Sequence, residues 1–338
     1  MTLKSMLIVP LCELTDGQEA DLFALLSAKE QLTTRDKRPY FRVSFRDARR
    51  EVSFPIWGDS ALAVDCRDAW QVGMFYKIRG TYRETEYGPQ LEIARIREIN
   101  DADRADGFSE LMCLPASRFD PEEVYNDLLA IVDTEITDAA VQKLVTAILK
   151  DNREELLTLP AATHNHHAFV GGWLEHVRSV VQTVLYLVDK YAEYYADMQP
   201  PLSKDVAVAG AILHDIGKLR ELRQQPQGAE YTSSGSLIGH ILQGRDIVRE
   251  AAQNIPLDEE TMLRLEHVIV SHQRLPEWGS PKPPMTPEAL LVHYADDIDA
   301  KFHNFYTILR DDAHAGSMTS SRNLLHQKLY RGEESPAD

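Results

Sequence analysis

The sequence predicts a chain of two unlike domains, an all-β barrel followed by an all-α helical bundle. Residues 38–98 alternate apolar and polar side chains, which is the repeat of strands that bury one face. From about residue 121 onward, apolar residues recur at spacings of three and four, as in amphipathic helices. The chain has 338 residues, 43% of them hydrophobic, and this is enough to form two such cores.

Two hairpins are expected in the first domain. The segment "RPYFRVSFRDARREVSFPIWGD" alternates on both sides of the polar turn RDARRE. The segment "VGMFYKIRGTYRETEYGPQLEIARIREI" repeats this design, with its turn near Glu86–Gly88. Four or more short strands with glycines between them favour a small barrel, and an OB-fold is the expected type for residues 1–100.

Aromatic and basic residues are interleaved along these strands. Such a pattern suits a groove that stacks bases and follows phosphates, and Tyr40 and Arg42 are our candidates for contact with single-stranded nucleic acid. The pattern fits equally well with aromatic residues in the barrel core and arginines on a solvated face. The formal net charge of −17 works against non-specific binding to polyanions, so a nucleic-acid role needs a local basic patch or metal ions.

The remainder of the chain divides by composition. Residues 101–120 are polar and weakly periodic, which predicts a linker. Residues 121–312 are expected to form the helical bundle, and the polar residues 313–338 a loosely held tail. Helices are predicted from Pro121 and at about 138–151, 172–195, 204–216, 238–253, 259–272 and 287–310.

A cytoplasmic protein that does not enter membranes is expected. The sequence has no apolar run of about 18 residues, and its start lacks the basic residues and small-residue cleavage site of a signal peptide. Its three cysteines are widely scattered, which predicts neither a disulfide framework nor a thiolate zinc site.

The histidines are confined to one part of the chain. All twelve lie between residues 164 and 326, beyond the predicted barrel. Imidazole and carboxylate groups together bind divalent transition metals, and one carboxylate can bridge two ions. A single helical histidine is more often a core or surface residue, so the prediction depends on the whole set. In chain order the candidates are His176, His214, Asp215, His240, His272 and Asp296.

This order, H…HD…H…H…D, resembles that of the HD-domain metal-dependent phosphohydrolases. Longer segments resemble the YhaM-type 3′-to-5′ exoribonucleases, which combine an N-terminal OB-fold with a C-terminal HD domain. These segments are "HNHHAFVGGWLEHV", "ILHDIGKLREL", "YTSSGSLIGHI" and "VIVSHQRLPEWGSPKPPMTPEALLVHYADDIDAK". The resemblance covers roughly residues 40 to 310 and departs at Gln273, where relatives often have a second histidine.

The resemblance implies that the six candidate residues bind two divalent ions, Mn²⁺ in the first place, with Fe, Co, Ni or Zn as alternatives. Asp215 would bridge the two ions and help to hold the attacking hydroxide. Lys218 lies three residues later, so its ammonium can reach the ligand side of the helix and contact a phosphate. Asp215 and Lys218 are therefore the predicted catalytic residues.

Four further residues are expected near this site. The resemblance places His166 and His167 close to the substrate. Asp299 and His293 lie three residues on either side of Asp296, so they can share its helix face and orient ligands.

The resemblance implies a metal-dependent 3′-to-5′ exonuclease that hydrolyses single-stranded RNA to nucleoside 5′-monophosphates. Single-stranded DNA is an optional second substrate. The barrel would hold the strand, and assembly into a homo-oligomer is allowed. One alternative is an HD phosphohydrolase acting on nucleotides or cyclic dinucleotides, for which the barrel would be unnecessary. A second is a single-strand-binding regulatory protein with an inactive HD domain, against which the intact ligand set argues.

Overall fold

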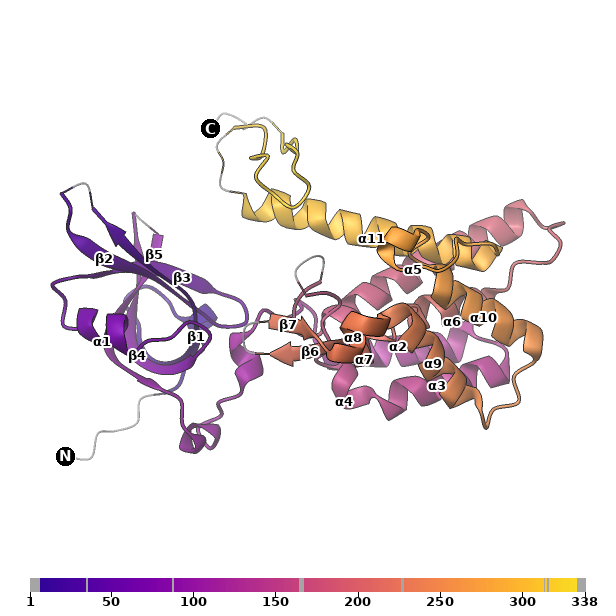
Figure 1. The fold of residues 1–338 in the computed structure, drawn as a ribbon, viewed down its shortest axis with the longest axis horizontal. Helices are drawn as coiled ribbons and strands as arrows, with labels where there is room; N and C mark the ends of the chain where they lie inside the picture. The colour runs from indigo at the N-terminus through magenta and orange to yellow at the C-terminus, as the bar shows by residue number, and fades with distance from the viewer. Residues whose placement is uncertain are drawn as a thin grey trace. The chain divides into compact units, whose positions relative to one another are not determined.

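The chain forms two compact units, one consisting mainly of the chain up to Ala116 and the other of most of the chain from Ser117 onward (Figure 1). Each unit has its own hydrophobic core, so each is described by itself. This computed structural model describes residues 7–34, 36–86, 88–163, 167–225, 228–312, 314 and 316–332.

The first unit is a five-stranded antiparallel barrel. Its strands are β1 (Glu19–Thr33), β2 (Pro39–Arg46), β3 (Glu51–Trp57), β4 (Phe75–Thr85) and β5 (Gly88–Glu98), and helix α1 (Ala63–Asp68) connects β3 to β4. The strand order is β3-β2-β1-β4-β5, and β3 also approaches β5, which closes the barrel. This connectivity is that of the OB-fold, as the sequence predicted.

Strand β1 has no counterpart in the sequence prediction. Residues 20–26 are all buried, because this half of β1 is covered on both faces and therefore lacks the alternation of a half-exposed strand. Strand β1 pairs with both β2 and β4, so it is central to the sheet. Phe41, Phe45, Tyr76 and Tyr82 are buried in the barrel core, whereas Trp57 is 49% exposed.

The expected linker, residues 101–120, is ordered over much of its length. It contains 3-10 helices at Asp101–Arg104 and Glu110–Cys113. The carboxylate of Asp103 accepts hydrogen bonds from Arg97 and Lys77 of the barrel, and Phe108 packs edge-on against Phe23. The segment looked like a linker because its polar residues are paired with barrel residues instead of following a periodic pattern.

The second unit is a bundle of helices. The helices are α2 (Pro121–Glu135), α3 (Ala139–Asp151), α4 (Arg153–Leu156), α5 (Gly172–Tyr194), α6 (Lys204–Leu213), α7 (Lys218–Glu221), α8 (Ser233–Ile238), α9 (His240–Ala252), α10 (Glu259–Ser271) and α11 (Pro287–Asp311). A two-stranded ribbon, β6 (Leu222–Gln225) and β7 (Gly228–Tyr231), follows α7, and 3-10 helices occupy Leu11–Glu13 in the first unit and Pro276–Trp278 in the second. Among the described residues, no helix has both the length and the hydropathy to cross a lipid bilayer.

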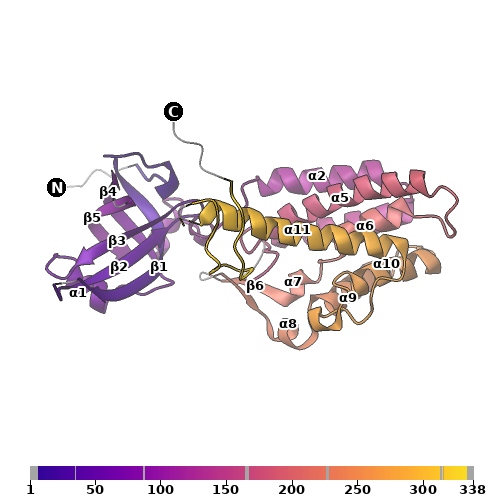
Figure 2. The same cartoon turned by 90° about the horizontal axis from the view of Figure 1, so that it is seen from above.

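Helix α6 lies at the centre of the bundle. All its residues from Val206 to Leu213 are buried, and it packs against α5, α10 and α11 (Figures 1 and 2). Such a helix is apolar on all sides, which explains the "AVAGAIL" sequence. Helix α6 ends at Leu213, three residues before the predicted end, and the chain turns at the residues that bear the HD motif.

The tail expected over residues 313–338 is folded in its described part. Met318 and Tyr330 form a β-bridge, and Thr319 donates its backbone N–H to the carbonyl of Leu329. The side chains of Thr319 and Leu329 are buried. Local pairing of this kind leaves no periodic trace in a polar sequence.

Candidate metal centre

The six predicted ligands converge inside the bundle from separate segments. His176 lies in the second turn of α5, His214 and Asp215 directly follow α6, His240 begins α9, His272 directly follows α10, and Asp296 lies within α11. The side chains of His176, His214 and His272 are fully buried. Those of His240 and Asp296 are 12% and 16% exposed. Of these five side chains, those of His240 and Asp296 are therefore the ones that solvent reaches.

Two glycines allow this convergence. A Cβ atom on Gly217 would lie 1.9 Å from the carbonyl oxygen of His240, so only glycine lets the turn after Asp215 approach the start of α9. A Cβ atom on Gly172 would lie 2.0 Å from the carbonyl oxygen of His167, which similarly brings that segment against the first turn of α5.

Each oxygen of Asp215 faces its own pair of histidines. Oδ2 lies 3.7 Å from Nε2 of His176 and 3.6 Å from Nε2 of His214. Oδ1 lies 3.3 Å from Nε2 of His240 and 3.5 Å from Nε2 of His272. A carboxylate in this position can bind one cation through each oxygen.

Asp296 joins the first of these pairs. Its Oδ1 lies 3.3 Å from Nε2 of His176 and 3.9 Å from Nε2 of His214. Two donors bound about 2.1 Å from one ion stand roughly 3.0 to 4.2 Å apart, depending on the angle between them. The observed separations fall within this range.

The four histidines share one orientation. In each, Nδ1 faces a fixed acceptor: Asp299 Oδ2 for His176 (2.7 Å), the Ala211 carbonyl for His214 (2.9 Å), Glu221 Oε1 for His240 (2.9 Å) and the Ile269 carbonyl for His272 (2.8 Å). Carbonyl and carboxylate oxygens only accept hydrogen bonds, so Nδ1 carries the proton. Nε2 of each histidine is then the nitrogen that faces the cluster.

The electrostatics of the cluster favour a cation. Burial by itself would raise the pKa of Asp215, but Lys218 and His214 outweigh it and hold this pKa well below its usual value. The pKa of Asp296 is also lowered, because the hydrogen bond from His176 outweighs burial. Conversely, Asp296 and Asp299 outweigh burial at His176 and raise its pKa to about 10. A site that holds a proton this tightly has a surplus of negative charge.

Two buried atoms indicate that a metal ion fits this negatively charged site. Among the described residues, Asp215 Oδ1 and His272 Nε2 are buried without a hydrogen-bond partner. A buried polar atom without a partner costs about 1–3 kcal/mol. A cation between these atoms would satisfy both, and donor sets of imidazole and carboxylate are typical of divalent transition metals.

Lys218 lies on the ligand side of its turn, but its ammonium is not turned to solvent. Its Nζ lies 2.7 Å from Asp215 Oδ2 and donates to the carbonyl of Ala161 at 2.5 Å. The side chain is 8% exposed. The predicted phosphate contact would require this ammonium to turn away from Asp215.

Four further residues were predicted close to the six candidate ligands, namely Asp299, His293, His166 and His167. Asp299 accepts hydrogen bonds from His176 and from the hydroxyl of Ser179, and it lies 3.2 Å from Nε2 of His167. His293 donates from Nδ1 to the backbone carbonyl of His272 at 2.7 Å, so it contacts the main chain of a candidate ligand. The predicted substrate contact His166 lies outside the described residues.

Tyr40 and Arg42 belong to the first unit. They lie on β2, where the Tyr40 ring is 5.3 Å from the exposed ring of Trp57 on β3, and the Arg42 side chain is exposed. Together they form an aromatic and basic surface on the outside of the barrel.

Two residues near His240 were not predicted as part of the site. Oε1 of Glu221 accepts both the backbone N–H and the Nδ1 proton of His240, each at 2.9 Å. Gln273, at the position where the family resemblance fails, has its amide nitrogen 3.2 Å from Nε2 of His240. No regular spacing in the sequence connects Glu221 to His240, so only the fold reveals this contact.

The segment that contains the six candidate ligands matches a known domain family. Residues 173–301 match the family model of the HD domain. The chain is 30% identical over 289 residues to the 3′-5′ exoribonuclease YhaM of Bacillus subtilis (strain 168) and 31% identical to that of Bacillus licheniformis. Both alignments cover 85% of this chain and 86% of the relative.

A solved structure, the second OB-fold domain of replication protein A from Methanococcus maripaludis, is also similar. It is 15% identical with a TM-score of 0.22, and the match covers 28% of this chain and 96% of that domain. The OB-fold assignment therefore depends on the strand order given above. With an HD domain, an OB-fold and close relatives over most of its length, the chain belongs to the YhaM family of 3′-5′ exoribonucleases.

Proposed function

We propose that this protein is a metal-dependent exonuclease that removes nucleoside 5′-monophosphates from the 3′ end of single-stranded RNA, and of single-stranded DNA as a second substrate. The observation that carries this proposal is the position of Asp215 between two pairs of histidines. It is supported by similarity over most of the chain to proteins named as 3′-5′ exoribonucleases.

Two divalent ions would share Asp215. His176, His214, Asp296 and Asp215 Oδ2 would hold one ion, and His240, His272 and Asp215 Oδ1 the other. We assign Mn²⁺ to both positions, with Fe, Co, Ni and Zn as alternatives for the same donors. When bound, two such ions supply a hydroxide near neutral pH and polarise the phosphoryl oxygens.

The protein's own residues would position these groups. Lys218 keeps the carboxylate of Asp215 ionised and fixed, Asp299 and Glu221 orient His176 and His240, and His293 holds the backbone at His272. The phosphodiester would approach the ions at the exposed edges of His240 and Asp296. His167, and His166 by the family resemblance, would lie close to the substrate.

The barrel would hold the strand upstream of the cleaved bond. Tyr40 and Trp57 offer rings on which bases can stack, and Arg42 offers a charge for the backbone. We expect the protein to act in the cytoplasm on RNA, and a homo-oligomer is compatible with this role. The three described cysteines are all free, as is usual in a reducing compartment.

Product analysis on defined strands tests the proposal. The Mn²⁺-loaded protein should shorten a 5′-labelled single-stranded RNA from its 3′ end in single-nucleotide steps and release nucleoside 5′-monophosphates. A 3′-phosphate on the same strand should slow the first step. Cleavage within the strand, or turnover of free nucleotides or cyclic dinucleotides in place of strands, would refute the proposal.

A further inference from the structure

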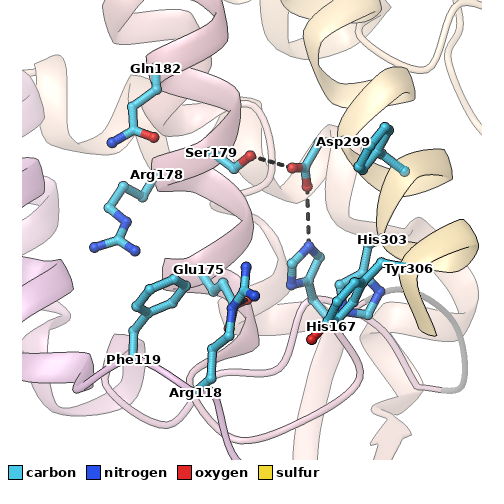
Figure 3. Close-up of a pocket in the computed structure, with 11 residues that line it drawn as sticks. Arg118, Phe119, His167, Glu175, Arg178, Ser179, Gln182, Asp299, His303 and Tyr306 are labelled. Atoms are coloured by element: carbon cyan, nitrogen blue, oxygen red, sulfur yellow. Dashed lines mark hydrogen bonds and ion pairs between the residues drawn. The ribbon is translucent and has the colours of Figure 1, made fainter. Parts of the chain in front are cut away.

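A second feature of the helical unit lies beside the metal centre. A cavity of about 400 Å³ opens between α5 and α11 (Figure 3). Asp299 and Ser179 line it, and Asp299 accepts the Nδ1 proton of the candidate ligand His176. One imidazole ring therefore separates this cavity from a ligand nitrogen. The volume lies within the usual range for small-molecule sites, about 300–1,000 Å³.

The guanidinium group of Arg118 lies between two aromatic rings of the cavity. The guanidinium carbon of Arg118 lies 4.8 Å from the centre of the Phe119 ring and 5.5 Å from that of the Tyr306 ring. Phe119 and Arg118 precede α2, whereas Tyr306 belongs to α11, so the rings come from separate segments. The Arg118 side chain is 63% exposed, which leaves it free to exchange places with another flat, delocalised group. A nucleobase is such a group.

A buried carboxylate faces the same space. Glu175, on α5, lines the cavity and its side chain is 8% exposed. Its Oε2 accepts the hydroxyl proton of Ser117 at 2.6 Å, while its Oε1 lies 3.4 Å from Nε of Arg118. If Arg118 moves, Oε1 becomes available as an acceptor. Carboxylates in such positions bind the hydroxyls of ribose.

We propose that this cavity receives the 3′-terminal nucleotide of the strand, with its base stacked on Phe119 and Tyr306 and its ribose hydroxyls bound by Glu175. This inference rests on the proposed exonuclease function and adds to it the site that holds the terminal nucleotide. The 2′-hydroxyl distinguishes RNA from DNA, so a carboxylate at this position would favour a terminal ribose. Arg118, displaced from between the rings, would remain close enough to contact a phosphate.

Kinetics of the first cleavage step test the cavity. Tyr306→Leu should raise KM for a single-stranded RNA by about tenfold, the size expected for loss of stacking on one base. Arg118→Ala should raise KM by a similar factor, because it removes a charged contact to phosphate. Two matched controls leave the cavity intact. Tyr294→Leu removes another exposed tyrosine from α11, and Arg153→Ala removes an arginine that lies over the Tyr125 ring. If the cavity variants behave as these controls do, the inference is wrong.

The terminal sugar gives a second and more specific readout. Two strands that differ only in a 2′-deoxy terminal nucleotide should be cleaved with different kcat/KM by the wild type. Glu175→Gln should bring this ratio close to one. A ratio that Glu175→Gln leaves at the wild-type value would remove the carboxylate from the proposal. Thermal unfolding of each variant establishes that it is folded.

Calorimetric titration with adenosine 5′-monophosphate separates this inference from the proposed function. If the wild type releases no nucleotide from any strand, the exonuclease proposal fails, yet weaker binding of the monophosphate to Tyr306→Leu would still support the cavity. If KM changes but the free monophosphate does not bind, the occupant is the strand terminus alone. If the cavity variants change neither KM for RNA nor the binding of the monophosphate, the inference is overturned.

Discussion

Lys218 and Asp215 form a buried ion pair, with Nζ 2.7 Å from Oδ2. This pair links the stability of the bundle to its metal content, because Lys218 and a cation both neutralise the same carboxylate. Lys218→Met should lower the free energy of unfolding of the metal-free protein by about 3 kcal/mol, since it leaves a buried charge uncompensated. Added Mn²⁺ should restore most of this loss.

Urea unfolding with a chelator and with Mn²⁺ measures the effect. Lys204→Met is a suitable control, because Lys204 pairs with Glu135 at the surface of the same unit. A loss of stability that is equal in both conditions, combined with a raised KM for RNA, would instead assign Lys218 to the phosphate contact predicted from the sequence.

Replacing the shared carboxylate should separate chemistry from strand binding. Asp215→Ala removes the donor that both histidine pairs face, so hydrolysis should fall below detection while binding of single-stranded RNA to the barrel persists. Asp297→Asn changes a neighbour of Asp296 that instead pairs with Lys301, and it should remain active. Gel-shift and cleavage assays on the same RNA test both properties. Activity close to the wild type in Asp215→Ala would rule out the bridging role.

The two histidine pairs predict the metal stoichiometry. The wild type should bind two divalent ions per chain, and His240→Ala should retain one. His267→Ala is the control, because His267 accepts a backbone hydrogen bond from Met285 outside the cluster. Elemental analysis after dialysis against Mn²⁺ gives the counts. A single ion in the wild type, or two in His240→Ala, would contradict the arrangement.

The cluster of histidines and aspartates could be predicted from the sequence because its six members follow one another in the order H…HD…H…H…D, which resembles that of a known family. "ILHDIGK" joins the buried end of a helix to three ionisable residues, and such residues are almost never fully buried unless they are paired. Alternation of apolar and polar residues predicts the strands of both hairpins, whose outer faces are polar. Strand β1 could not be predicted in this way, because burial on both faces removes the alternation.

The contacts that orient the ligands could not be predicted in the same way. Asp299 was identified because it shares a helix with Asp296, and helical spacing is visible in a sequence. Glu221 reaches His240 only through the turn at Gly217, and Arg118 meets Tyr306 only through the packing of the bundle. Pairings between segments depend on the tertiary fold, which no local pattern records.

Glu221 should determine how tightly the second ion binds. Glu221→Gln keeps the volume but replaces one carboxylate oxygen with an amide nitrogen, so His240 loses its charged acceptor. Loss of such a partner typically weakens metal binding by about 10- to 100-fold. Competition with a chelating dye measures the affinity, and Glu250→Gln, which alters the partner of Arg220 at the surface, is the control. Equal affinities in the two variants would show that Glu221 does not position His240.

The barrel should have its own pH-dependent stability, centred on Asp103. Both oxygens of Asp103 accept from Arg97 at 2.7 Å, and the side chain is 1% exposed. The hydrogen bond from Arg97, opposed by burial, lowers the pKa of Asp103 well below its usual value. Because the folded pKa is lower than the unfolded pKa of about 3.9, the ionised carboxylate stabilises the barrel above that pH, and the contribution is lost as pH falls toward the folded value.

Asp103→Asn should therefore destabilise the barrel by about 2 kcal/mol near neutral pH, which is the usual contribution of a hydrogen bond to a charged group. The difference from the wild type should shrink as the pH falls below about 4, because the unfolded wild-type chain then takes up a proton that the folded carboxylate does not hold, and this uptake favours unfolding. Urea unfolding at a series of pH values measures this difference. Asp106→Asn, at a carboxylate that is 52% exposed and also pairs with Lys77, should have a much smaller effect. A difference that stays constant with pH would mean that the side chain contributes through its shape and neutral hydrogen bonds instead of its charge.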